Sequence, residues 1–146
     1  MQKKFNPWAR NQARRALVQA LYQWQLSATE LEILEKEYTV GKKSRQFDSE
    51  FFLTILRAVL TNFVEIDGIY SQHLDRNLGD LDPIEKAILR LGSYELKERQ
   101  DVPFRVVVDE YVELAKVFGA EDSFKYVNGI LDAVGRKLRL SGDGRL

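Results

Sequence analysis

The chain has 146 residues, in which 22 lysines and arginines balance 22 aspartates and glutamates, with one histidine and no cysteine. This length is that of a single domain with a sizeable core, and 45% hydrophobic with 30% charged residues excludes a wholly disordered chain. A net charge of zero argues against a uniformly basic nucleic-acid binder, and the lack of cysteine excludes disulfides and cysteine-ligated zinc. No apolar run reaches the roughly 20 residues of a membrane span and no signal-peptide core is present, so we expect a cytoplasmic protein.

Apolar residues recur at three- and four-residue spacing along nearly the whole chain, which predicts helices and almost no strand. The first helix is expected over about residues 9–27, and a short acidic helix over 29–38 precedes a polar loop at 41–45. A long helix capped by Asp48 or Ser49 follows, and another is predicted from about 67 to 78.

Three further helices complete the prediction. Asp82-Pro83 has the pattern of an N-cap followed by a first-turn proline, so a helix starts there and runs to about residue 99. The next helix follows Pro103 and is closed by Gly119, and the last carries its apolar face through Leu138. We therefore predict an all-α bundle of seven helices in one domain, residues 1–140, with a flexible tail at 141–146.

The first helix has a basic end. Residues 1–15 carry five cations and no acid: Lys3, Lys4, Arg10, Arg14 and Arg15. Helical geometry places Arg10 and Arg14 beside the apolar line and turns Arg15 and Tyr22 away from it. Cations beside an unburied ring suit single-stranded RNA, in which phosphates meet the cations and bases stack on the ring. The alternative is a solvated N-terminal turn.

The helix after Pro83 carries a second polar row. Lys86, Arg90, Ser93 and Lys97 follow one another at helical spacing without an acid. Like charges at this spacing repel weakly, so the row does not stabilise the helix, and a phosphate backbone would account for it. A face that serves solubility is the alternative.

The last helix leaves several residues on the side away from its core stripe: Asp122, Lys125, Tyr126, Gly129 and Ala133. A ring on such a face is available for stacking or for a partner. Glycine inside a helix is unfavourable, and a close backbone approach is one reason to retain it. Asp122 has the structural alternative of a helix N-cap.

Catalytic patterns are missing. His73 is the only histidine, which argues against a metal site and a Ser/His/Asp triad, and no phosphate-binding glycine loop is present. Glu95, Glu110 and Glu113 are expected to bond buried backbone or an arginine across the bundle. We therefore predict a binding protein without a cofactor, not an enzyme.

Five segments in this order resemble the NusB family of bacterial transcription antitermination factors, over Arg10 to about Asp132. The segments are residues 14–22, 85–96, Val102-Pro103, 109–119 and 124–132, the last reading Phe-Lys-Tyr-Val-Asn-Gly-Ile-Leu-Asp. The resemblance implies two roughly perpendicular bundles of three and four helices. It also implies binding of boxA RNA from the leaders of ribosomal RNA operons together with NusE, a small ribosomal subunit protein, within the RNA polymerase antitermination complex.

The resemblance also assigns roles to residues. Arg10 and Arg14, with neighbouring Arg15, would meet RNA. Five further positions match the RNA-facing surface: Tyr22, Arg90, Asp122, Lys125 and Tyr126. The NusE surface would include His73, Arg76, Asp82 and Glu85.

The sequence departs from the family pattern at a few positions. Asn11 and Gln12 interrupt the arginine cluster and Arg15 stands where an acid is common, which implies a different RNA affinity or preferred sequence. Tyr111 replaces a small residue, which concerns packing. Two alternatives stay open: an RNA-targeting helical subunit beside a methyltransferase, and a protein-interaction module in which exposed rings form a homodimer.

Overall fold

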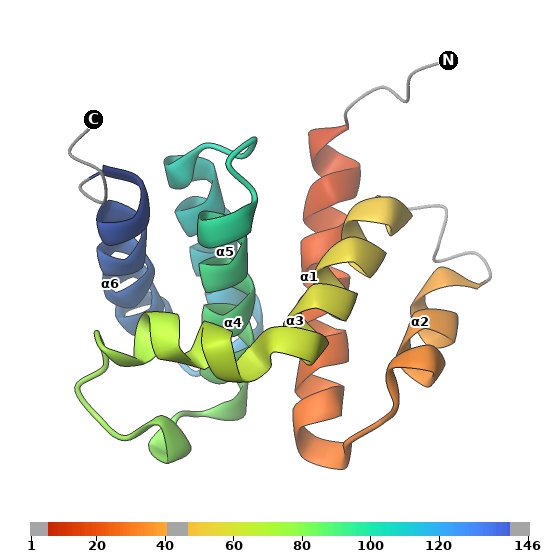
Figure 1. The fold of residues 1–146 in the computed structure, drawn as a ribbon, viewed down its shortest axis with the longest axis horizontal. Helices are drawn as coiled ribbons and strands as arrows, with labels where there is room; N and C mark the ends of the chain where they lie inside the picture. The colour runs from red at the N-terminus through yellow and green to blue at the C-terminus, as the bar shows by residue number, and fades with distance from the viewer. Residues whose placement is uncertain (1–5, 41–46, 141–146) are drawn as a thin grey trace. The chain divides into compact units, whose positions relative to one another are not determined.

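The computed structural model describes residues 6–40 and 47–140, which form six α-helices and no strand (Figure 1). The all-α prediction is therefore confirmed for this part of the chain. Lys3, Lys4, the predicted loop at 41–45 and the predicted tail at 141–146 lie outside the described residues. The chain divides into two compact units, Met1–Leu60 and Thr61–Leu146.

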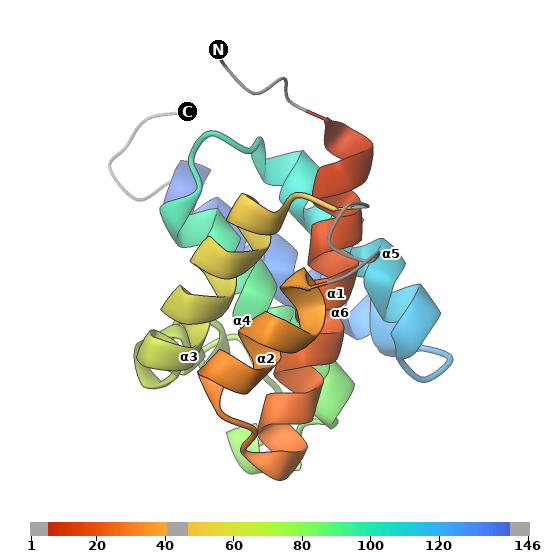
Figure 2. The same ribbon diagram turned by 90° about the vertical axis from the view of Figure 1, so that its right-hand side faces the viewer.

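The first unit contains α1 (Pro7–Ser27), α2 (Leu31–Thr39) and the first part of α3 (Ser49–Ser71). Asn6 caps α1 by accepting the backbone N–H of Ala9 at 3.1 Å, and Ala28 ends the helix with a left-handed φ of 54°. After this short connection α2 returns alongside α1 (Figures 1 and 2). The core contains apolar side chains from all three helices, among them Leu17, Leu21, Leu34, Phe52 and Ile55.

Helix α3 corrects the prediction of two separate helices, over 48–66 and 67–78. One helix spans the predicted junction and leaves helical geometry only at Asn62, with φ −118° and ψ 25°. Asp67 lies inside this helix and does not begin a new one, and its carboxylate binds the Tyr70 hydroxyl and the Arg90 guanidinium. The helix ends at Ser71, and a short 3-10 turn, η2 (Leu78–Asp80), follows the intervening segment.

Three mutually packed helices dominate the second unit: α4 (Pro83–Glu98), α5 (Phe104–Phe118) and α6 (Ser123–Gly135). Asp82 caps α4 as predicted, accepting the N–H groups of Ile84 at 2.8 Å and Glu85 at 3.3 Å. Helices α4 and α6 approach closely at Gly92, where a Cβ atom would lie 2.8 Å from the Leu131 side chain.

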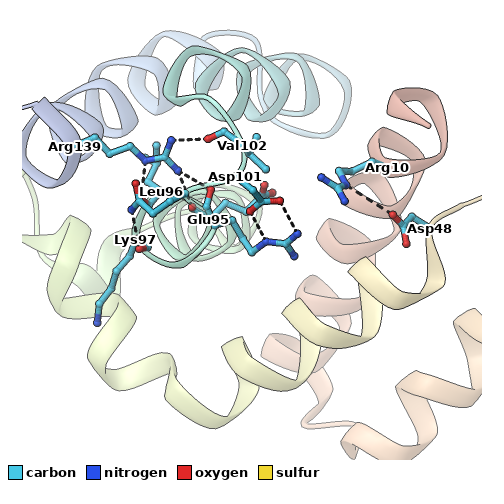
Figure 3. A network of polar contacts seen from close by, with 10 residues as sticks. Arg10, Asp48, Glu95, Leu96, Lys97, Asp101, Val102 and Arg139 are labelled. Atoms are coloured by element: carbon cyan, nitrogen blue, oxygen red, sulfur yellow. Dashed lines mark hydrogen bonds and ion pairs between the residues drawn. The ribbon is translucent and has the colours of Figure 1, made fainter. Parts of the chain in front are cut away.

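The last predicted helix continues past Gly135 as a π-helical turn, η3 (Arg136–Leu140), which carries Arg139 to the end of α4. Its guanidinium donates to four backbone carbonyls, those of Glu95, Leu96, Arg99 and Val102, at 2.5–3.1 Å (Figure 3). These carbonyls lie at and just beyond the C-terminal turn of α4, where a helix end leaves carbonyls short of donors. Two of them also accept a backbone N–H, Glu95 from Arg99 at 2.9 Å and Arg99 from Val102 at 3.0 Å. Arg139 thus joins the chain after α6 to the α4–α5 connection.

The large Tyr111 side chain is buried in the second unit, where its hydroxyl has a hydrogen-bond partner. Its hydroxyl donates to the fully buried Glu95 carboxylate at 2.5 Å. One partner of Glu95 is thus a phenol, which the sequence analysis did not predict. None of the described helices has the length and apolar character needed to cross a membrane.

Candidate nucleic-acid interface

The outward face of α1 agrees with the helical-wheel prediction. Arg15 is exposed and Tyr22 retains 36% of its accessible surface. Leu17 and Val18, which lie between them in the sequence, are fully buried. The helix therefore has distinct core and solvent faces, and Arg15 and Tyr22 lie on the solvent face.

Arg14 contradicts the prediction of a basic face open to solvent at this end of α1. It is 2% exposed, donates to Asn11 Oδ1 at 2.6 Å, and places its guanidinium 5.1 Å from the centre of the Phe51 ring. Arg10 is also largely covered, with a side chain that is 16% exposed, 3.7 Å from Asp48 Oδ2 and 4.5 Å from the Phe51 ring centre (Figure 3). Both arginines therefore pack against the start of α3, which a pattern within α1 cannot reveal.

The acid-free row on α4 is likewise not an open cationic face. Arg90 is 5% exposed and binds Asp67 of α3 through two hydrogen bonds of 2.8 Å. Ser93 is fully buried, and Lys97 binds Glu65 at 2.5 Å. The acids that pair with Arg90 and Lys97 lie on α3. Because Arg90 is buried in such a pair, it cannot meet an RNA strand in this conformation.

Asp67 is held by a second donor as well. The Tyr70 hydroxyl donates to Asp67 Oδ1 at 2.7 Å in the same buried cluster. Burial, followed by the hydrogen bond to Asp67, raises the pKa of Tyr70 well above its ordinary value, so the phenol stays protonated and continues to donate. Arg90, Asp67 and Tyr70 form an internal link between α3 and α4.

The start of α6 presents charged side chains to solvent. Asp122 and Lys125 have side chains that are 77% and 71% exposed, and their charged atoms lie 3.7 Å apart. Asp122 occupies the N-cap position but its side chain makes no capping hydrogen bond. Asp122 is therefore the N-cap residue by position, but its exposed carboxylate does not cap the helix.

Tyr126 joins two groups of residues that the sequence analysis assigned to different surfaces. Its hydroxyl donates to Asp75 Oδ1 at 3.0 Å, and the Arg76 guanidinium lies 4.2 Å from its ring centre. Arg76 Nε also donates to the same Asp75 oxygen at 2.8 Å. Hydrogen bonds from Arg76 and then Tyr126 lower the pKa of Asp75. The ring is thus backed by a guanidinium and fixed at its hydroxyl.

The other residues predicted for a protein partner differ in exposure. Glu85 is only 8% exposed and accepts the Ser123 hydroxyl at 2.9 Å, so it fastens α4 to the start of α6 instead of offering a contact surface. Asp82 is exposed but caps α4. His73 is half-buried, and its Nε2 atom is buried without a hydrogen-bond partner.

Gly129 lies on the exposed side of α6, and a Cβ atom there would meet nothing within 4 Å. The close approach that would explain this glycine is therefore absent from the described part of the chain. Glycine costs about 1 kcal/mol relative to alanine inside a helix. Within residues 6–40 and 47–140, no cluster of three or more acidic or histidine side chains could hold a metal ion.

Asp75 is the residue that sequence reasoning missed. The pattern predicted a helix through residue 78, whereas the chain leaves helical structure after Ser71. A loop at this point brings Asp75 to Tyr126 of α6, and no local signal in the sequence indicates that contact.

Comparison with known proteins gives a consistent result. The model of the NusB family matches residues 11–136. The transcription antitermination protein NusB of Alcanivorax borkumensis is 52% identical over 133 residues, covering 91% of this chain and 89% of the relative. The transcription antitermination protein NusB of Pseudoalteromonas atlantica is 47% identical over 133 residues, which cover 91% of this chain and 95% of the relative.

Solved structures agree with this result. NusB of T. maritima superposes with a TM-score of 0.77 at 31% identity, covering 94% of each chain. A complex of the antitermination factors NusB and NusE with double-stranded RNA contains a chain with a TM-score of 0.72 at 26% identity, covering 86% of this chain and 95% of that one. These relatives confirm the prediction of a non-enzymatic protein, since they are transcription antitermination factors. The chain belongs to the NusB family of transcription antitermination proteins.

Proposed function

We propose that this protein binds RNA together with NusE. The observation that carries the proposal is the platform on α6, where the Tyr126 ring is backed by Arg76 and lies beside the exposed Asp122 and Lys125. A related NusB occurs in a complex with NusE and RNA, which supports the assignment.

The platform has complementary parts for a nucleic acid. A base can stack on Tyr126, whose ring is already oriented by Asp75 and Arg76. The Lys125 ammonium suits a phosphate, whereas the Asp122 carboxylate would repel a phosphate and suits the amino group of a base. On α1, Arg15 and Tyr22 offer a second cation and ring. Arg10, Arg14 and Arg90 act by holding helices in place.

The finer proposal follows the family resemblance. The RNA would be a boxA-type element from the leader of a ribosomal RNA operon, and the protein would act in the cytoplasm within the RNA polymerase antitermination complex. NusE would contact the exposed Arg76 and Asp82, whereas His73 is half-buried and Glu85 is buried. Single-stranded RNA is our preferred form, because stacking on Tyr126 needs an unpaired base.

The test is a titration of boxA-type RNA against a scrambled RNA and a duplex, with and without NusE. Tyr126→Ala should weaken binding of the boxA strand by about 1–3 kcal/mol, while Tyr126→Phe keeps most of the affinity because the ring remains. Tyr94→Ala, at another half-buried tyrosine of the second unit, is the control. Equal binding of boxA and scrambled RNA, or unchanged affinity in Tyr126→Ala, would contradict the proposal.

Exposed apolar side chains favour a second candidate, a protein-interaction module that forms a homodimer and does not bind RNA. Leu26 at the end of α1 and Ile33 on α2 retain 59% and 48% of their accessible surface. Gel filtration across a concentration series distinguishes the candidates, since a dimer predicts a mass that rises with concentration and no retention of RNA.

A further inference from the structure

The outer face of α6 continues beyond Tyr126 to a second cationic group. Lys125, Gly129, Asp132 and Arg136 follow one another at spacings of four, three and four residues, which places them along one side of the helix. The distance along the axis from Lys125 to Arg136 is about 16 Å, at 1.5 Å per residue.

Two arginines share one carboxylate at the far end of this face. Arg105 Nη2 of α5 lies 3.0 Å from Asp132 Oδ1, and Arg136 Nε lies 2.8 Å from Asp132 Oδ2. The arginine side chains are 53% and 62% exposed, whereas that of Asp132 is 30% exposed. Asp109 lies 3.8 Å from Arg105, and neighbouring Lys137 binds the neutral Gln72. Both arginines therefore keep more than half of their side-chain surface exposed while they share the Asp132 carboxylate.

A shared carboxylate fixes the direction of both guanidiniums before any ligand arrives. Guanidinium groups recognise phosphate through paired hydrogen bonds, and a fixed orientation lowers the entropic cost of binding. The same face offers little to a protein partner, because none of the exposed large apolar side chains of the described residues lies on α6.

Gly129 lies between the two ends of this face. Nothing within the described chain fills the space that a side chain would take there, although alanine would favour the helix. The absence of a Cβ atom would allow a ligand backbone to lie directly on the helix.

We propose that an RNA strand bound at Tyr126 continues along this face, passing over Gly129 and placing a phosphate against Arg105 and Arg136. This inference rests on the proposed function and extends it to three residues that no comparison assigns. The alternative is that the arginines only tie α5 to α6 and that Gly129 has no role in binding.

The experiment measures the affinity of the full chain for a series of RNAs lengthened one nucleotide at a time from the shortest that binds. Gly129→Ala should raise the Tm of the free protein, since alanine favours a helix, yet weaken binding of the longer RNAs several-fold. Arg105→Gln with Arg136→Gln should weaken the longer RNAs about tenfold and flatten the salt dependence. Both variants should bind the shortest RNA as the wild type does.

The control is Lys36→Gln with Arg57→Gln, which removes two exposed cations from the first unit. If the arginine pair behaves like this control, and Gly129→Ala binds every length as the wild type does, the proposed path is wrong while RNA binding stands. If the wild type binds none of the RNAs, with or without NusE, the proposed function fails as well.

Discussion

Arg90 shows how a charged residue with a predicted binding role can instead belong to the interior. Its guanidinium and the Asp67 carboxylate are both nearly buried, and each neutralises the other. Removing one member of such a pair leaves an uncompensated charge away from water, which costs more than the pair itself contributes.

We expect Arg90→Ala to destabilise the protein by about 3–5 kcal/mol, because the buried Asp67 carboxylate would lose its positively charged partner and keep only the Tyr70 hydroxyl that the structure shows. Urea denaturation measures this loss. Arg57→Ala, which breaks an exposed ion pair with Glu35, is the control and should cause a much smaller change. A stable Arg90→Ala variant with weakened RNA binding would show that Arg90 contacts RNA directly.

His73 provides a pH probe, since it is the only histidine in the chain. Burial and then the nearby positive charge of Lys137 lower its pKa from the ordinary 6.5. The unfolded chain therefore binds more protons than the folded protein as the pH falls below 6.5, and stability should decrease in that direction.

An NMR titration of the single imidazole should give a pKa below 6.5, and His73→Gln should reduce the loss of stability on acidification. Lys137→Gln should move the pKa only partly back toward 6.5, because burial is the larger cause. An imidazole pKa at or above 6.5 would contradict this account.

Patterns within one helix predicted the exposure of Arg15 and Tyr22 correctly. They failed at Arg14 and Arg90, which are buried through contacts with α3. A row of cations on one helix does not reveal whether the acids that neutralise it lie on another.

At the scale of elements, the signals that bound α4 and α5 were reliable, whereas the start predicted at Asp67 was wrong. The Asp82-Pro83 pattern predicted the start of α4, and Gly119 marks the end of α5. The segment after α3 was not predicted, because its apolar spacing continues after the backbone leaves the helix at Ser71. That segment supplies Asp75 and Arg76, so the contacts of these two residues with Tyr126 could not be predicted from the sequence.

The C-terminal end of α4 depends on a residue from η3. We expect Arg139→Ala to destabilise the protein by about 2 kcal/mol, because carbonyls of Glu95, Leu96, Arg99 and Val102 lose a charged donor. Thermal unfolding measures the loss, and hydrogen exchange should show it at the end of α4. Arg136→Ala is the control within the same turn, and an equal effect of the two substitutions would contradict a specific capping role.

At the scale of the whole molecule, net neutrality limits how strongly RNA can be held by charge alone. The local charge in the sequence predicts about four to six phosphate contacts, but Arg14 and Arg90 are buried and Arg10 is largely covered. Among the residues that the structure describes, the exposed cations that we place against phosphate are Arg15, Lys125, Arg105 and Arg136, whereas Arg76 lies against the Tyr126 ring. The structure thus favours about three or four phosphate contacts.

The salt dependence of RNA binding tests this smaller number. Each phosphate contact with a single strand contributes about −0.7 to the slope of log affinity against log salt, so the chain without NusE should give a slope of about −2 to −3. Arg15→Gln should make the slope shallower by about 0.7, whereas Arg14→Gln, once its folding is confirmed by circular dichroism, should leave the slope unchanged because Arg14 meets Phe51 and not RNA. A slope steeper than about −4 would mean that cations beyond these four reach the RNA, so that our count of phosphate contacts is too low. A flat response would mean that phosphate contacts do not contribute to binding.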